Sequence, residues 1–182
     1  ERSISDFFLS WGWKGNKVLP IPMPYPRLEI KNKEKIKKKY GNFCLFVFWS
    51  TPKFAQHLSY SNRSDIYFEK SLLPSYKFIE KISKKTSTYV RLPPYDKTWN
   101  EKTYLNKIRD IKFDNHDYEF EEMSSASNFV ITNHFSTVAL QSISLNIPTF
   151  ICCDKNFIEY NPKAKNYLDD LIKAKIFFYK FN

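Results

Sequence analysis

The chain has 182 residues, of which 42% are hydrophobic and 18% aromatic, so it can bury the core of one domain of ordinary size. Its formal net charge of +10 permits anionic partners, and it contains no run of about 18 apolar residues that could span a membrane. The three cysteines, Cys44, Cys152 and Cys153, lie in apolar runs with neither disulfide nor zinc spacing. We therefore expect buried, reduced thiols, which are typical of a cytoplasmic protein.

Residues 1–41 are predicted to form a connector followed by a basic segment. Prolines at alternate positions from Pro20 to Pro26 each remove a backbone donor and favour extended geometry in the preceding residue. We interpret this stretch as an extended strap rather than a helix, with a polyproline ligand as the alternative.

The basic segment is "KNKEKIKKKY", which places six lysines between Lys31 and Lys39. We expect a short exposed helix that ends at Gly41, because glycine commonly terminates helices. Such a helix is compatible with full solvation and with peripheral contact to an anionic membrane. No RNP-like, zinc-finger or helix-turn-helix signature accompanies it, so nucleic acid is not an expected partner.

Residues 42–182 are predicted to form one α/β domain with a Rossmann-like parallel sheet flanked by helices. Continuous apolar runs such as "NFCLFVFWS" are typical of strands buried on both faces of a parallel sheet, and the helical segments between them indicate right-handed βαβ units. The expected strands are residues 42–50, 88–93, 111–113, 128–133, 148–154 and 176–181. The expected helices are residues 66–85, 101–109, 117–125, 136–146 and 161–175.

Ligands of open parallel sheets bind outside the carboxyl ends of the strands, which directs attention to three predicted turns. These turns are residues 50–53, 93–96 and 133–137. Asp96 in the second turn is more typical of a turn residue than of a general base.

The third turn, "NHFST", carries the strongest signal, since Ser136 and Thr137 stand where a helix is expected to begin. A hydroxyl there can cap free backbone N–H groups, or it can help those groups and the helix dipole to hold a phosphate. Asn133 and His134 lie beside it, at the end of the strand. No GxGxxG or Walker sequence occurs, so neither a nicotinamide cofactor nor P-loop chemistry is supported.

Two further residues are candidates for the same site. Arg91 ends a predicted strand, where its guanidinium can pair with a carboxylate or recognise a phosphate. Gln141 follows Ser136 and Thr137 by about one helical turn, so it faces either the same ligand or solvent. No complete catalytic constellation and no metal-binding motif is present, and the catalytic residues stay unassigned.

Three stretches, "SDFFLSWGWK", "VRLPPYDKTW" and "ASNFVITNHFSTVALQSISLNIPTF", follow one another in the chain. Together they resemble a bacterial family of surface-carbohydrate transferases, which is similar to the C-terminal half of GT-B glycosyltransferases and to capsule and teichoic-acid phosphotransferases. The resemblance spans most of the chain, and its last motif is the most specific.

The resemblance implies a domain that binds a nucleotide-sugar donor as substrate, with no other cofactor and no metal. It places Ser136 and Thr137 beside the donor diphosphate and Arg91 near donor or acceptor phosphates. Related enzymes often carry a glutamate where this chain has Gln141, whose amide can donate and accept hydrogen bonds but has no charge.

GT-B enzymes usually react in a cleft between two Rossmann-like domains, so the resemblance implies a partner domain on the N-terminal side. The absence of an initiator methionine favours the same interpretation, a fragment of a two-domain enzyme. We expect glycosyl transfer to a polysaccharide or lipid-linked cell-surface precursor, in the cytoplasm, with peripheral contact at the inner membrane left open. The alternatives are transfer of a phosphorylated polyol from a CDP donor, and a non-catalytic basic binding or scaffold domain.

Overall fold

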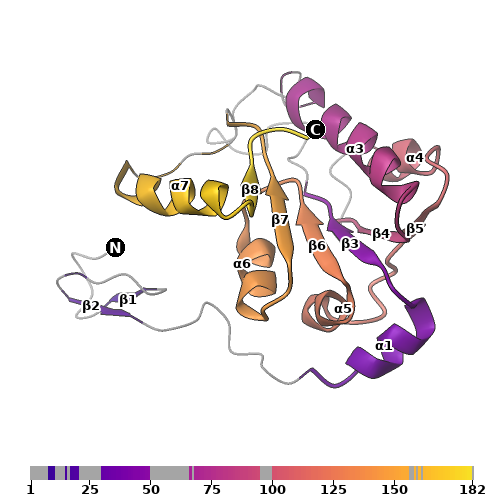
Figure 1. The fold of residues 1–182 in the computed structure, drawn as a ribbon, viewed down its shortest axis with the longest axis horizontal. Coiled ribbons are helices and arrows are strands. Elements are labelled where there is room, and N and C mark those ends of the chain that lie inside the picture. The colour runs from indigo at the N-terminus through magenta and orange to yellow at the C-terminus, as the bar shows by residue number, and fades with distance from the viewer. Residues whose placement is uncertain are drawn as a thin grey trace. The chain divides into compact units, whose positions relative to one another are not determined.

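The computed structural model describes residues 8–10, 15, 17–20, 30–49, 66, 68–94, 100–155, 158, 160 and 162–181 (Figure 1). It divides into two compact units, Glu1–Ile30 and Lys31–Asn182. In the first unit, strands β1 (Phe8–Ser10) and β2 (Val18–Pro20) pair in parallel, which the sequence did not predict. Pro22, Pro24 and Pro26 lie outside the described residues.

The second unit is built on a parallel sheet of six strands, in the order β5-β4-β3-β6-β7-β8. The strands are β3 (Cys44–Val47), β4 (Thr88–Arg91), β5 (Ile111–Phe113), β6 (Phe129–Thr132), β7 (Thr149–Cys152) and β8 (Phe177–Phe178). Counted along the chain within this sheet, the order is 3-2-1-4-5-6, that of the Rossmann fold. The predicted α/β, Rossmann-like class is therefore confirmed.

Helices separate the strands as the periodicity predicts. They are α1 (Lys33–Tyr40), the π-helical turn η1 (Phe68–Leu72) continued by α3 (Leu73–Ser83), α4 (Glu101–Leu105), α5 (Phe120–Ala126), α6 (Thr137–Ser144), and the 3-10 turn η3 (Pro162–Ala164) leading into α7 (Lys165–Lys173). Helix α5 begins three residues later than predicted, because residues 114–119 form a turn in which the Asp114 carboxylate accepts the His116 N–H.

Apolar side chains fill both faces of the sheet. Alternate residues of β3 point to opposite faces, so that Phe46 packs with residues of α3 and α4, while Leu45 packs with residues of α1 and α5. A third cluster joins Ile151 of β7 to α6 and α7. Figure 1 shows α3 and α4 beside β4 and β5, and α6 and α7 beside β7 and β8. This two-sided burial explains the continuous apolar runs in the sequence.

The three cysteines are buried and free, as predicted. Burial raises the pKa of the Cys44 thiol to about 12 and that of Cys153 to about 11, so both stay protonated at neutral pH. Within the described ranges, no helix has both the length and the apolar character needed to cross a bilayer.

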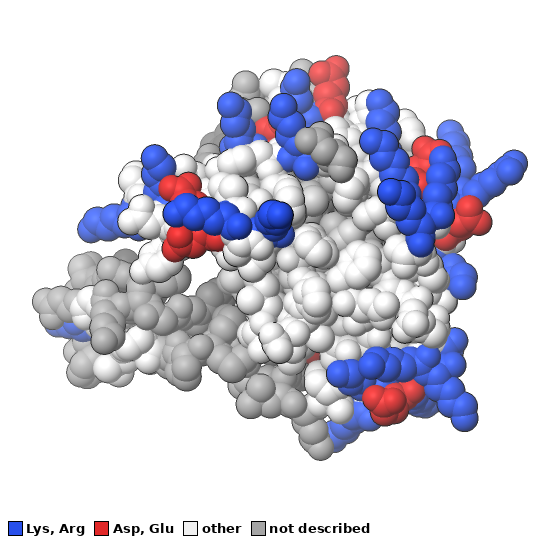
Figure 2. Space-filling view, viewed as in Figure 1, with Lys and Arg blue, Asp and Glu red and all other residues white. Residues whose placement is uncertain are grey.

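The lysine-rich segment is a helix, α1, and it belongs to the second unit. Ile36 is 0% exposed and packs in the core cluster of α5, while the Asn32 amide donates to the Glu122 carboxylate at 2.7 Å. The helix ends at Gly41, which has a φ of 70°. The lysines of α1 gather on its outer surface, as Figure 2 shows.

Candidate functional site

The order of the strands places a topological switch point between β3 and β6. The chain runs outward from β3 through β4 to β5, and then returns to continue from β6 through β7 to β8. In such sheets the helices after the two central strands diverge to opposite faces, which opens a crevice at the carboxyl ends of those strands. The predicted turn of residues 133–137 follows β6 and so lies at the carboxyl end of these central strands.

Asn133 joins the ends of β3 and β6. Its side-chain oxygen accepts the Trp49 backbone N–H at 2.7 Å, and its amide nitrogen donates to the Trp49 carbonyl at 2.8 Å. The side chain thereby extends the pairing of the two strands beyond Val47 and Thr132, and Asn133 is 1% exposed. Both amide atoms have partners in the protein, so Asn133 positions the turn.

His134 lies on the ring of Trp49, with 4.0 Å between ring centroids and 29° between ring planes. Its Nδ1 atom is buried and has no hydrogen-bond partner. Burial lowers the pKa of His134, and a hydrogen bond with the Phe135 backbone opposes this effect. The imidazole is therefore neutral at neutral pH, with one ring nitrogen that a ligand can still engage.

Ser136 stands at the N-cap position of α6 with extended backbone geometry, yet its side chain makes no capping hydrogen bond. Its Oγ atom is buried and has no partner. Of the two roles that the sequence left open for this hydroxyl, capping is thus not the one observed. Thr137, the first helical residue, is exposed. The start of α6 consequently offers a hydroxyl and the positive end of the helix dipole to an anion.

Arg91 lies at the end of β4, separated from β6 by β3. Its guanidinium donates to the Asp114 carboxylate at 2.9 Å and to the Tyr118 carbonyl at 3.1 Å. The Asp114 side chain is 1% exposed, so this is a nearly buried ion pair. The pairing is the carboxylate alternative that the sequence left open for Arg91.

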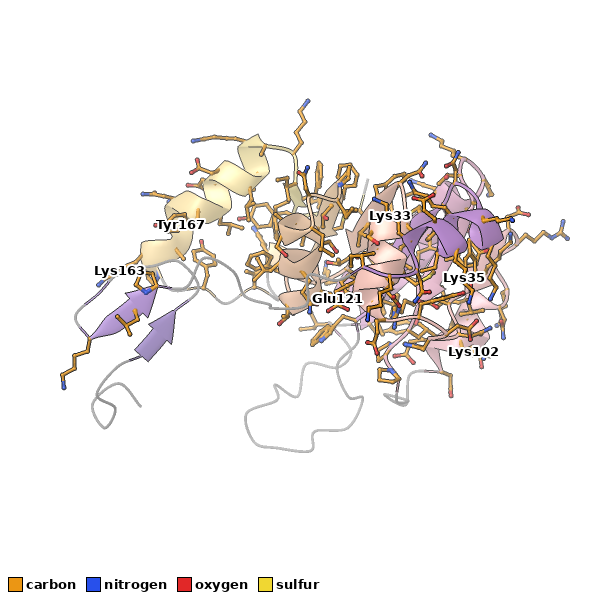
Figure 3. All side chains as sticks on the ribbon, turned by 90° about the horizontal axis from the view of Figure 1, so that it is seen from below. Lys33, Lys35, Lys102, Glu121, Lys163 and Tyr167 are labelled. Carbon is orange, nitrogen blue, oxygen red and sulfur yellow. The ribbon has the colours of Figure 1, made fainter. Side chains whose placement is uncertain are left out.

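Gln141 is turned toward helix α5. Its amide donates to the Glu121 carboxylate over a long 3.4 Å, and Figure 3 shows Glu121 between α5 and α6. Glu121 is almost fully buried. A carboxylate is therefore present beside Gln141, contributed by the neighbouring helix α5.

Sequence reasoning missed two polar residues of the same sheet edge. Among the described residues, four buried side-chain atoms have no hydrogen-bond partner: the Tyr76 hydroxyl, Glu101 Oε1, His134 Nδ1 and Ser136 Oγ. Tyr76 lies in the first half of α3, which follows β3, and Glu101 begins α4, which follows β4. All four atoms therefore lie in segments that follow the carboxyl ends of parallel strands. Unpaired buried polar groups are costly, so this edge of the sheet is the candidate ligand site.

The position of Glu101 at the start of a helix that follows a strand was a usable signal. The sequence did not indicate that Glu101 is buried, because this burial depends on the packing of α3 against α4. Within the described part of the chain, no three His, Cys, Asp or Glu side chains are grouped to hold a metal ion. The predicted turn at residues 50–53 and Asp96 of the second predicted turn lie outside the described residues.

Comparison with known proteins decides the family. The model of the LIC12162 family transferases matches residues 1–181. The chain belongs to the LIC12162 family of transferases. No curated protein matches it. The transferase class of this LIC12162-family chain agrees with a candidate site at the switch point of the sheet, where His134 and Ser136 each keep one buried polar atom unpaired.

Proposed function

We propose that this LIC12162-family chain binds a nucleotide-activated sugar and supplies the donor half of a glycosyltransferase of GT-B type. The acceptor would be a polysaccharide or lipid-linked precursor of the cell surface. The resemblance to GT-B enzymes supports the glycosyl class, and the switch point in the strand order supports a nucleotide ligand at the carboxyl end of the sheet.

The observation that carries the proposal is the unpaired hydroxyl of Ser136 at the start of α6. A buried hydroxyl that neither caps its helix nor bonds elsewhere is best satisfied by a ligand oxygen. The dipole of α6 favours an anion at the same place, and a diphosphate combines both properties. His134 would add a hydrogen bond through its free Nδ1 atom.

In the proposed reaction an acceptor hydroxyl attacks the anomeric carbon of the donor sugar. The bond between that carbon and the diphosphate oxygen breaks, and the nucleoside diphosphate leaves with the electron pair. Ser136, Thr137 and the first amides of α6 would stabilise the charge that develops on the leaving group. The base that accepts the hydroxyl proton would come from the second domain that the GT-B architecture requires.

Isothermal titration calorimetry with UDP, CDP and GDP tests the proposal. We expect the wild type to bind at least one of them, and a Ser136→Ala/Thr137→Ala double variant to lose tenfold or more in affinity, which corresponds to about 1.4 kcal/mol. Ser144→Ala is a matched control, because Ser144 ends the same helix and its hydroxyl bonds only the Gln141 carbonyl among described residues. Equal affinities for the wild type and the double variant would remove the phosphate site. Failure of all three nucleotides to bind would favour a non-catalytic basic domain.

A second candidate is the transfer of a phosphorylated polyol from a CDP-linked donor, because Gln141 stands where related glycosyltransferases often carry a glutamate that contacts the donor sugar or ribose. The Gln141 amide carries no charge, and it donates to the Glu121 carboxylate. In this reaction the acceptor hydroxyl attacks the β-phosphorus, the bond to the bridging oxygen breaks, and CMP leaves. Incubation with CDP-linked and UDP-linked donors separates the candidates, since CMP release indicates phosphopolyol transfer and release of a nucleoside diphosphate indicates glycosyl transfer.

A further inference from the structure

Tyr76 and Glu101 form a buried polar pair on the α3 and α4 side of the sheet. Each residue is 6% exposed, and neither the Tyr76 hydroxyl nor Glu101 Oε1 has a hydrogen-bond partner. Burial raises the pKa of the Tyr76 phenol, and the nearby Glu101 carboxylate raises it further. Tyr104, which follows Glu101 by three residues on α4, has its ring centroid 5.4 Å from that of Tyr76, so the two groups lie on adjoining parts of α3 and α4.

A column of aromatic rings holds this pair in place. Tyr76 stacks on Phe48 with a centroid distance of 5.6 Å, and on Tyr104 with a centroid distance of 5.4 Å, with the planes within 3° and 7° of parallel. Tyr104 lies one turn after Glu101 on α4. The ring plane of Tyr76 is thus fixed from both sides, which is the kind of preorganisation that a binding site requires.

The same aromatic column connects Tyr76 and Glu101 to the turn after β6. Phe48 directly follows β3, and its N–H donates to the Arg91 carbonyl of β4 at 2.8 Å. Its neighbour Trp49 is held by Asn133 and carries the ring of His134. Two consecutive residues at the end of the central strand therefore separate the two groups of unpaired atoms. A ligand that lies across the end of β3 would meet both groups.

The chemistry of the pair limits which part of a ligand can lie there. A carboxylate repels phosphate, and the pair lacks a cation: among the described residues no salt bridge to Glu101 is formed. An unpaired buried carboxylate is costly unless it accepts hydrogen bonds, and neutral hydroxyl groups can donate them. Hydroxyls on adjacent carbons suit a carboxylate and a phenol side by side, since the carboxylate offers two acceptor oxygens and the phenol both donates and accepts.

We propose that Glu101 and Tyr76 bind a neutral vicinal diol of the ligand, while the start of α6 binds its phosphates. The diol belongs either to the ribose or to the transferred group of the donor, and this inference rests on the proposed function. The strands β4 and β6, whose ends approach the two groups, lie two strand spacings apart, about 10 Å, which one nucleotide can bridge.

The test compares three ligands on the full chain by calorimetry: the nucleoside diphosphate that binds best, its 2′,3′-dideoxy analogue, and inorganic pyrophosphate. For the wild type we expect at least a tenfold preference for the hydroxyl-bearing nucleotide. Glu101→Gln and Tyr76→Phe should each reduce that preference to within about threefold and leave the pyrophosphate affinity within twofold. Glu80→Gln is the matched control, because Glu80 is exposed on α3 and pairs with Lys84.

A second arm locates the diol. If the variants keep the preference for the ribonucleotide but lose affinity for the sugar-linked donor, the diol is that of the transferred group, and the inference holds. Unchanged affinities for both ligands would overturn the inference and leave the phosphate site standing. Equal losses for pyrophosphate and nucleotide would also overturn it, whereas a wild type that binds no nucleotide removes the proposed function together with it.

Melting curves separate binding from a structural role. Glu101→Gln replaces an unpaired buried carboxylate by a neutral amide of the same shape, so we expect a melting temperature equal to or above that of the wild type. A large decrease would show that the carboxylate is satisfied inside the protein, which would contradict its role as a ligand group.

Discussion

The residues at the strand ends differ in whether the protein itself satisfies their polar atoms. Asn133 and Arg91 have their partners in the fold, whereas His134 and Ser136 each keep one buried atom unpaired. The first two therefore set the shape of the carboxyl edge, and the second two are the candidates for contact with a ligand. Residue type alone did not reveal this division, because all four side chains are polar and lie at or just after the end of a strand.

The pair of Arg91 and Asp114 predicts a large effect on stability. Arg91→Met would leave the Asp114 carboxylate buried without its cation, and we expect the free energy of unfolding to fall by about 3–5 kcal/mol. Urea denaturation measures the change. The double variant Arg91→Met/Asp114→Leu should recover much of the loss, because both charges are then removed. A loss below 1 kcal/mol for Arg91→Met, as expected for the exposed pair of Lys84 and Glu80, would contradict this account.

His134 predicts a pH dependence of stability. Because burial lowers its pKa in the folded state, the unfolded chain binds the proton more readily, and stability falls as pH falls through the unfolded value of about 6.5. The loss is complete once pH is below the folded pKa. We expect His134→Asn to flatten the unfolding free energy between about pH 7 and pH 5.

His116→Asn provides the control for this pH dependence. His116 is exposed and has a φ of 62°, a conformation that asparagine tolerates. The control should keep the slope of the wild type between pH 7 and pH 5. A His134→Asn variant with the same slope as the wild type would show that the imidazole does not lose its proton on folding.

Among the elements, helix α1 has a charged outer surface and buries one side chain, Ile36, in the core. Its lysines explain much of the net charge, yet the helix is held to α5 by Ile36 and by the bond between Asn32 and Glu122. We expect Ile36→Ala to lower the free energy of unfolding by about 2–5 kcal/mol, as for other large-to-small core changes.

Lys37→Ala is the matched control for α1, since Lys37 lies one residue away and is exposed. It should change stability by less than about 0.5 kcal/mol, and both variants can be compared by urea denaturation. Similar small effects for the two substitutions would show that α1 is a solvated segment that does not contribute to the fold.

The elements were predictable where one local pattern determined them. Strand β3 is apolar on both faces and was read directly as a buried parallel strand, and Gly41 marked the end of α1. Helix α5 was placed too early, because the turn before it is set by Asp114, whose partner Arg91 comes from another strand. Tyr76 and Glu101 were missed for a similar reason, since their burial depends on two helices meeting. Local hydrophobic periodicity does not reveal which distant segments of the chain are in contact.

At the scale of the whole molecule, the sequence did not predict the order of the strands in the sheet. Alternating strands and helices indicate a parallel sheet, but they do not state which strands become neighbours. The observed order makes β3 and β6 the seam between two halves of the sheet, one made of β3, β4 and β5 and the other of β6, β7 and β8. The candidate site lies at the carboxyl end of this seam, so the topology joins the fold to the proposed function.

Asn133 provides the test of this connection, because it extends the seam beyond the ladder of β3 and β6. Asn133→Ala removes two hydrogen bonds to the Trp49 backbone, and we expect the unfolding free energy to fall by about 2 kcal/mol. Hydrogen exchange at the Trp49 amide should accelerate by at least tenfold, and the affinity for the nucleotide should fall, since His134 and Ser136 lie on the turn that Asn133 holds. Asn115→Ala, an exposed change two residues after the end of β5, should alter none of these quantities. Unchanged exchange at Trp49 in Asn133→Ala would mean that the ladder alone fixes the seam, and that the geometry of the turn does not depend on this side chain.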